Sequence, residues 1–159
     1  MDAGMRTETD PAAMVRQLRL DADSGVPKAC FDLGRCYTEG TPPLTKNVAL
    51  GMQWLEKSAD AGLGDGQCQV GMMYMTGDGV AKDCERGMCY LRLAAEQDMP
   101  IAQHLLAECY TSGQGGVPQD YVEAARWLRR AADSGFAESQ WMLSAYAHKT
   151  RLGASSAHA

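Results

Sequence analysis

Apolar residues along most of this chain follow a helical period. They recur at positions i, i+4 and i+7 in the stretches ACFDLGRCYTEG, QCQVGMMYMTG and AQHLLAECYTSG, which puts them on one face of an α-helix. Each stretch ends on a glycine, which cannot sustain the helix and suits a left-handed C-cap. The pattern predicts three helices that are each closed by a glycine, so we expect an all-α chain.

A second helix is predicted after each of these glycines. Good N-cap residues mark where these helices begin: Asn47, Asp83 and Asp120. Asp120 together with Glu123 also fits a capping box. The connectors GTPPLTKN, GDGVAKD and GQGGVPQD are rich in glycine and proline, and each carries one apolar residue that can pack between the helices: Leu44, Val80 or Val117. We therefore expect helical hairpins with tight turns rather than strands.

The helical hairpins repeat with a period of 36 or 37 residues. A tyrosine recurs at Tyr37, Tyr74 and Tyr110, and a large aromatic residue recurs at Trp54, Tyr90 and Trp127. Small residues recur between these columns at Gly34, Gly71 and Ala107 and at Gly51, Gly87 and Ala124. Small side chains let paired helices approach closely, while the aromatic columns fill the gaps. Such a period is typical of a stack of helical pairs.

The period divides the chain into repeats and end segments. Three full repeats are predicted at residues 25–61, 62–97 and 98–134, within a repeat domain at 25–148. Residues 11–24 match the second helix of a repeat and residues 135–148 match a lone first helix, so both are expected to cap the stack. The end segments 1–10 and 149–159 are predicted to be disordered.

These motifs resemble the Sel1-like repeats (SLR), relatives of the tetratricopeptide repeat. Units of that family read roughly A-x-x-x-L-G-x-x-Y-x-x-G, then G-V-x-x-D, then A-x-x-W-L-x-x-A-A-x-x-G. The third repeat matches at Ala102, Leu106, Tyr110, Gly113, Gly116, Val117, Asp120, Trp127, Leu128, Ala131, Ala132 and Gly135. The first repeat departs from the glycine-valine turn at Pro42-Pro43-Leu44. The resemblance implies a right-handed α/α superhelix (solenoid) and a non-enzymatic role as an adaptor or scaffold.

Positions on the first helices that the packing pattern leaves free are the candidate binding residues. In such stacks the first helices usually line the concave face, and exposed Phe, Trp and Met make good interface anchors. We predict a concave groove that binds a partner protein or peptide through Phe31, Arg35, Thr38, Cys68, Met72, Met75, His104, Glu108 and Trp141. The other interpretation is that the column of Phe31, Cys68, His104 and Trp141 simply packs against the neighbouring repeat.

Charge and hydropathy narrow the classes of partner. The chain has 15 basic and 20 acidic residues, a net charge of -5 and no run of Lys or Arg. Nucleic acid is therefore a poor partner, and a basic protein segment is a better one. The first residues lack an apolar segment after a basic cluster, and no membrane-length apolar run follows. These features favour a cytoplasmic protein with no membrane span.

The six cysteines favour structural thiols. They form no CxxC pair and no cluster with His that is typical of a zinc site: Cys30, Cys36, Cys68, Cys84, Cys89 and Cys109. No cofactor is predicted. Two remote hypotheses use Cys68: a soft-metal site with Met72, Met75 and Cys89, and a cysteine hydrolase with His104 as base and Glu108 as the orienting acid.

Two further hypotheses concern partners. The resemblance implies roles in secretion, virulence and toxin immunity as well, so a toxin-immunity or enzyme-inhibitor protein that occludes one target is an alternative to the adaptor. The last predicted helix carries Trp141, Met142 and Tyr146. If these side chains are exposed, two copies of the chain are expected to associate end to end.

Overall fold

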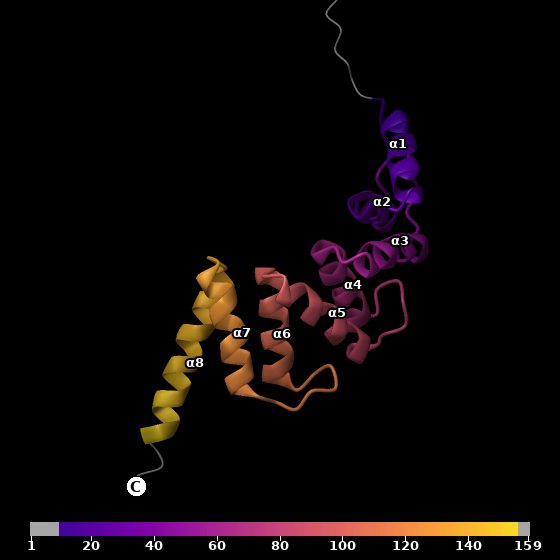
Figure 1. Ribbon diagram of the computed structural model, residues 1–159. Coiled ribbons are helices and arrows are strands. Elements are labelled where there is room, and N and C mark those ends of the chain that lie inside the picture. The colour runs from indigo at the N-terminus through magenta and orange to yellow at the C-terminus, as the bar shows by residue number, and fades with distance from the viewer. Residues whose placement is uncertain (1–9, 156–159) are drawn as a thin grey trace, which may run out of the picture. The chain divides into compact units, whose positions relative to one another are not determined.

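A computed structural model describes residues 10–155, with side chains described through Tyr146. All regular structure in this range is helical. Eight helices follow one another along the chain (Figure 1): α1 Pro11–Asp23, α2 Pro27–Glu39, α3 Val48–Asp60, α4 Gly64–Thr76, α5 Cys84–Glu96, α6 Pro100–Ser112, α7 Tyr121–Asp133 and α8 Ala137–Ser155. The predicted all-α class is confirmed. None of these helices combines the length and apolar character that crossing a bilayer requires.

The chain divides into two compact units, Met1–Gly66 and Gln67–Ala159, and the boundary falls within α4. In the first unit, α1, α2 and α3 enclose one core. Leu33 on α2 is fully buried there, and Leu18 from α1 and Trp54 from α3 pack against the same cluster. Leu44 from the α2–α3 turn also contacts this cluster, so the predicted packing of the turn residue between the helices is confirmed.

The second unit has two neighbouring clusters. Leu91 on α5 and Leu106 on α6 lie in the first cluster, and the turn residue Val117 packs against it. Ala124 and Leu128 on α7 form the second with Ala107. Tyr110 and Trp127 pack against both clusters. The repeated aromatic columns are therefore part of the scaffold.

Capping interactions fix the ends of the paired helices. The side chains of Asn47, Asp83 and Asp120 accept hydrogen bonds from amides in the first turns of α3, α5 and α7, as predicted. Gly40 and Gly113 end α2 and α6 in the left-handed conformation, with φ of 77° and 72°. The predicted capping box is only half present. The amide of Asp120 donates to the Tyr110 carbonyl, and Glu123 pairs with Arg126 instead.

A second set of hydrogen bonds ties three of the first helices, α2, α6 and α8, to the helix before each of them. Cys30 Sγ donates to the Ala22 carbonyl, at 3.4 Å. In the second unit, the side-chain amides of Gln103 and Gln140 donate to the carbonyls of Ala95 and Ala132, at 3.0 and 3.1 Å. Each donor lies eight residues after its acceptor, so the repeat itself sets this contact.

The last helix is longer than the sequence pattern predicts. Helix α8 continues to Ser155, whereas the terminal cap was expected to end at residue 148 and residues 149–159 to be disordered. The reason is that Thr150 stands where Gly40, Gly77 and Gly113 close the other first helices, so the stop signal is missing. The predicted disordered segment 1–10 falls almost entirely outside the described residues, as does 156–159.

Candidate protein-binding surface

Two adjoining cavities lie on the first helices of the second unit. One, of about 510 Å³, is lined by Met72 and Met75 of α4, Leu105 and Glu108 of α6, and Met142 of α8, among others. The other, of about 470 Å³, has this lining: His104, Glu108, Ala137, Glu138, Trp141 and Met142. Because Glu108 and Met142 line both cavities, we treat them as one surface, the α4–α6–α8 groove.

His104 is held in a fixed position in this groove. Its Nδ1 lies 2.9 Å from the hydroxyl oxygen of Ser139, and its Nε2 lies 3.7 Å from a carboxylate oxygen of Glu108 one turn along α6. The ring also packs on Phe136, with 5.2 Å between ring centroids. Only 12 % of the His104 side chain is exposed, and Ser139 is fully buried. His104 therefore forms a rigid wall of the groove.

Trp141 is the most exposed large apolar side chain described, at 73 %. It lies on α8 and lines the same cavity as Glu108 and Glu138. Other aromatic rings of the chain carry a cation of the chain itself: Lys57 lies over Trp54 at 3.9 Å and Arg130 over Trp127 at 5.0 Å. The charged groups that line the Trp141 cavity are instead the two carboxylates.

The structure brings five of the nine predicted binding residues together in this groove: Met72, Met75, His104, Glu108 and Trp141. It buries two others, because Phe31 is 8 % exposed and Cys68 is 3 % exposed. The burial of Phe31 and Cys68 agrees with the interpretation that these side chains pack inside the fold. Cys68 belongs to the core cluster of α5 and α6, so its thiol is not presented at the surface.

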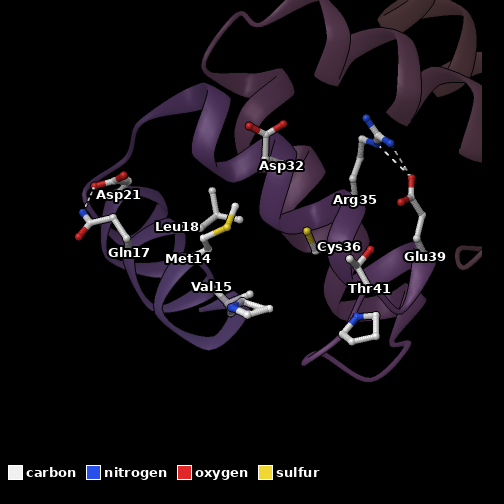
Figure 2. Close-up of a pocket in the computed structure, with 12 residues that line it drawn as sticks. Met14, Val15, Gln17, Leu18, Asp21, Asp32, Arg35, Cys36, Glu39 and Thr41 are labelled. Carbon is white, nitrogen blue, oxygen red and sulfur yellow. Dashed lines mark hydrogen bonds and ion pairs between the residues drawn. The ribbon is translucent and has the colours of Figure 1, made fainter. Parts of the chain in front are cut away.

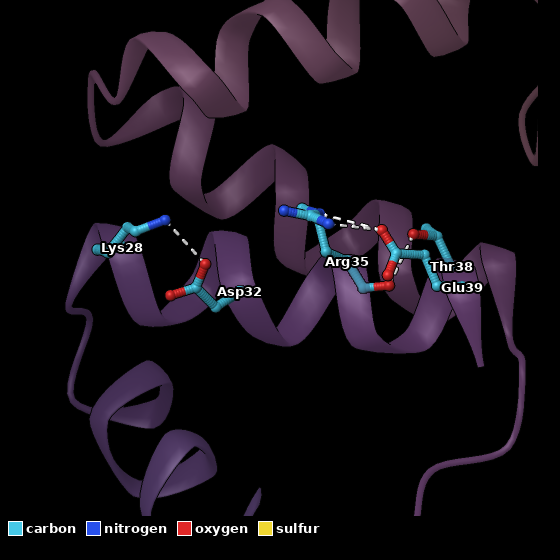
Figure 3. A network of polar contacts seen from close by, with 5 residues as sticks. All are labelled: Lys28, Asp32, Arg35, Thr38 and Glu39. Atoms are coloured by element: carbon cyan, nitrogen blue, oxygen red, sulfur yellow. Dashed lines mark hydrogen bonds and ion pairs between the residues drawn. The ribbon is translucent and has the colours of Figure 1, made fainter. Parts of the chain in front are cut away.

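The other two predicted residues, Arg35 and Thr38, lie on α2 in the first unit. Arg35 forms an ion pair with Glu39 at 2.8 Å, and the Thr38 hydroxyl donates to the Arg35 carbonyl (Figure 3). Thr38 also faces α3, where its methyl group approaches Gly51. A further ion pair, Lys28 to Asp32, lies on the same helix. These exposed pairs contribute little to stability but fix the charge pattern along α2.

Arg35 also lines a cavity of about 750 Å³ in the first unit, between α1 and α2 (Figure 2). Met14 and Leu18 of α1 are directed toward Cys36 of α2 across this space. Burial raises the pKa of the Cys36 thiol, and the nearby carboxylates of Glu39 and Asp32 raise it further. The thiol is thus kept neutral. The sequence did not predict this cavity, because half of its lining residues lie on α1, outside the first helices that were considered.

Burial keeps the thiols of Cys30, Cys36 and Cys109 neutral, because it raises the pKa of each. All six cysteines are free, and burial raises the pKa of Cys30 and raises that of Cys109 to about 11. A catalytic or metal-binding cysteine needs the opposite shift, toward the thiolate. Among the described residues, no group of three or more His, Cys, Asp and Glu side chains is placed to hold a metal ion.

Of the three residues predicted for an end-to-end dimer, Trp141 alone is well exposed. Met142 and Tyr146 are half-buried and pack against the cluster of Ala107, Ala124 and Leu128. The ring of Tyr146 also lies 6.1 Å from that of Tyr121. Among these three side chains, the exposed apolar area is therefore mainly the indole ring of Trp141.

Comparisons with known proteins agree with the repeat architecture. A family model described as Sel1 repeat matches residues 27–63, 64–99 and 100–136. The crystal structure of a Sel1 repeat protein from Oxalobacter formigenes is similar, with a TM-score of 0.76 and 34 % identity, over 82 % of this chain and 97 % of that one. A protective antigen of uropathogenic Escherichia coli with an SLR fold is also similar, with a TM-score of 0.60 and 28 % identity, over 79 % of this chain and 34 % of that one.

A curated relative is much longer than this chain. Chitin synthase regulatory factor 3 of Schizosaccharomyces pombe is 26 % identical over 154 residues. That alignment covers 92 % of this chain but only 16 % of the relative. The likeness therefore concerns the repeats and not the whole of the longer protein.

Proposed function

Since the chain belongs to the Sel1 repeat family, whose members generally mediate protein–protein interaction, we propose that it binds a partner protein through the α4–α6–α8 groove. One observation carries the proposal. Side chains from three successive first helices, chosen from the sequence as free positions, line two cavities that share Glu108 and Met142. Grooves of this kind gain specificity from a few side chains on a common scaffold.

The lining of the groove defines the chemistry of the partner. Met72 and Met75 are half-buried and flexible, so they can adapt to an aliphatic or aromatic side chain. Trp141 offers a large, rigid surface of the kind that dominates binding energy at interfaces. Glu108 and Glu138 supply negative charge next to it. The partner segment therefore combines an apolar anchor with a Lys or Arg that reaches the indole and the carboxylates.

Binding is the whole activity in this proposal, so the chain acts as a non-enzymatic adaptor. The hydrogen bond between His104 and Ser139 has a structural role in this proposal. The Ser139 hydroxyl is fully buried and is out of reach of a substrate. Free thiols fit a reducing compartment, so we place the binding event in the cytoplasm.

Affinity capture from the lysate of the source cell tests the proposal. Wild type is compared with a groove variant, Trp141→Ala with Glu108→Lys. The matched control is Tyr121→Ala with Glu96→Lys, which changes an exposed aromatic residue and an exposed acid of the same unit outside the groove. We expect a partner that wild type and the control retain and that the groove variant loses.

Two results would contradict the proposal. One is a partner that all three proteins retain, which would place binding outside the groove. The other is a partner lost equally by the groove variant and the control, which would point to a general effect of surface charge or of folding. Circular dichroism of the three proteins shows whether they remain equally helical.

A further inference from the structure

The cavity between α1 and α2 in the first unit has an apolar floor and an acidic rim. Met14, Val15 and Leu18 of α1 and Cys36 of α2 supply the apolar side chains. The rim holds three carboxylates: Asp21, Asp32 and Glu39. The cavity shares no lining residue with the α4–α6–α8 groove. Each of its two walls has equivalent positions in later repeats.

In a later repeat, the face of α6 that is equivalent to the α2 wall meets another first helix. By register, Asp32, Cys36 and Glu39 correspond to Leu105, Cys109 and Ser112 of α6. Those α6 residues line the 510 Å³ cavity of the second unit, and α4 faces them there with Met72, Met75 and Thr76. Cys109 also belongs to a buried cluster against which Met72 and Met75 pack, so the equivalent face of α2 suits the side of a helix.

In the next repeat, the face of α3 that is equivalent to the α1 wall packs against a first helix. Val15 and Leu18 correspond to Met52 and Leu55 of α3, which are 2 % and 0 % exposed. On α3, Leu55 packs so closely on α2 that a Cβ atom on Gly34 would lie 2.7 Å from its Cγ. In α1 the equivalent side chains are only half-buried and line the cavity.

Both walls of the cavity are thus faces that pack against a helix elsewhere in this chain. We propose that the α1–α2 cavity docks an amphipathic α-helix of a partner protein, with an apolar stripe on the floor and a Lys or Arg of that helix at Asp21. Helices α1 and α2 have 13 residues each, so the docked helix spans about three turns. Helix-in-groove recognition of this kind uses anchors at i, i+3 or i+4, and i+7.

The ion pairs around the cavity explain why the Lys or Arg of the docked helix is placed at Asp21. Asp32 is paired with Lys28 and Glu39 with Arg35, both at 2.8 Å (Figure 3). Asp21 instead accepts a hydrogen bond from the neutral side-chain amide of Gln17, at 2.8 Å. That contact leaves the charge of Asp21 in place, at the half-buried rim of the cavity. A basic side chain of the docked helix complements it.

The size of the Met14 side chain favours a partner helix over α8 of a second copy as the docked helix. Met14 stands at the position of Gly51 on α3, where a Cβ atom would lie 2.5 Å from Cγ2 of Thr38. The first helices of this chain therefore pack too closely to accommodate a methionine at that position. A helix that docks over Met14 sits farther from α1 and needs a different set of side chains.

A displayed library of helical peptides tests this proposal. The probe is a set of Ala-rich helices of about four turns, randomised on one face and selected on the full chain. Selected peptides are then titrated against Met14→Lys, with Leu20→Lys as its control, and against Asp21→Lys, with Asp23→Lys as its control. Met14 and Leu20 are 59 % and 61 % exposed on the same helix, but only Met14 lines the cavity.

We expect helices with an apolar stripe and one Lys or Arg. Their Kd rises at least about tenfold with Met14→Lys and with Asp21→Lys but not with either control. Exchanging the peptide cation for Glu restores binding to Asp21→Lys. The Trp141→Ala variant binds these peptides as wild type does, which separates this site from the proposed groove.

Three outcomes would overturn the proposal. In the first, no helix is selected. In the second, the controls weaken binding as much as the cavity variants do. In the third, sedimentation of the chain alone shows self-association that Met14→Lys abolishes, which would assign the cavity to a second copy.

Discussion

Gly34 on α2 and Gly51 on α3 bring the backbones of the two helices into contact. A Cβ atom on Gly34 would lie 2.9 Å from the Gly51 carbonyl oxygen, and one on Gly51 would lie 2.7 Å from the Gly34 carbonyl oxygen. The same relationship joins Gly71 and Gly87 in the next repeat, at 3.1 and 2.9 Å. Close contact between paired helices is thus the basic packing unit of this fold.

Replacing Gly51 by alanine is expected to destabilise the chain by about 1–3 kcal/mol, because the added methyl group forces the helices apart. Helix propensity alone predicts the opposite, a gain of about 1 kcal/mol for Gly→Ala. Urea unfolding distinguishes the two. Ala49→Gly, an exposed change on the same helix, measures the propensity term by itself. A Gly51→Ala variant more stable than wild type would show that the helices can separate at no cost.

The N-cap of α7 gives a second stability prediction. Asp120 accepts hydrogen bonds from the amides of Val122 and Glu123, at 2.9 and 3.0 Å. Asp120→Ala is expected to lower the free energy of unfolding by about 1 kcal/mol, whereas Asp120→Asn retains an acceptor and most of the stability. Thermal unfolding followed by circular dichroism compares these variants with Asp133→Ala, an exposed change at the other end of α7. Equal losses for alanine at both positions would mean that the cap is unimportant.

Cys109 makes stability depend on alkaline pH. Burial, with the Glu108 charge as a smaller contribution, raises the pKa of this thiol to about 11 from an ordinary value of 9.0. Between pH 9 and about 11 the thiol is deprotonated in the unfolded chain but still protonated in the folded one. The neutral thiol therefore contributes its full stabilisation below pH 9, and this stabilisation is lost as pH rises through about 11. The loss is on the order of 2–3 kcal/mol, because each pKa unit between the two values is worth about 1.4 kcal/mol.

Urea unfolding between pH 8 and about 11 measures this effect, and Cys109→Ala provides the comparison because it removes the titrating group. Wild type should lose more stability over the interval than the variant does. Parallel losses in the two proteins would show that other groups account for the alkaline sensitivity.

The sequence predicts the scaffold well because its signals are local and repeated. Asn47 and Asp83 start helices as N-caps, and Gly40 ends one in a left-handed conformation, each for reasons contained in a few neighbouring residues. The hydrogen bonds of Gln103 and Gln140 to the preceding helix could have been found in the same way. A glutamine at three equivalent positions, including Gln67, is the signal that was missed.

The groove was harder to predict because equivalent positions are buried to different extents. Phe31 and Trp141 share one column of the repeat, yet Phe31 is 8 % exposed and Trp141 is 73 % exposed. Register assigns a side chain to a face, but the neighbours on that face decide its exposure. The cavity at Met14 and Cys36 also depends on how a capping helix differs from a full repeat, which the repeat average conceals.

Calorimetric titration of the captured partner into wild type, Trp141→Ala and Tyr121→Ala tests whether the partner binds in the α4–α6–α8 groove. Both changes remove an exposed aromatic side chain of the same unit, but only Trp141 lines the α4–α6–α8 groove. A binding hot spot at Trp141 predicts a Kd about thirtyfold weaker for Trp141→Ala, with Tyr121→Ala close to wild type. Equal affinities of all three proteins would contradict the assignment of partner binding to this groove.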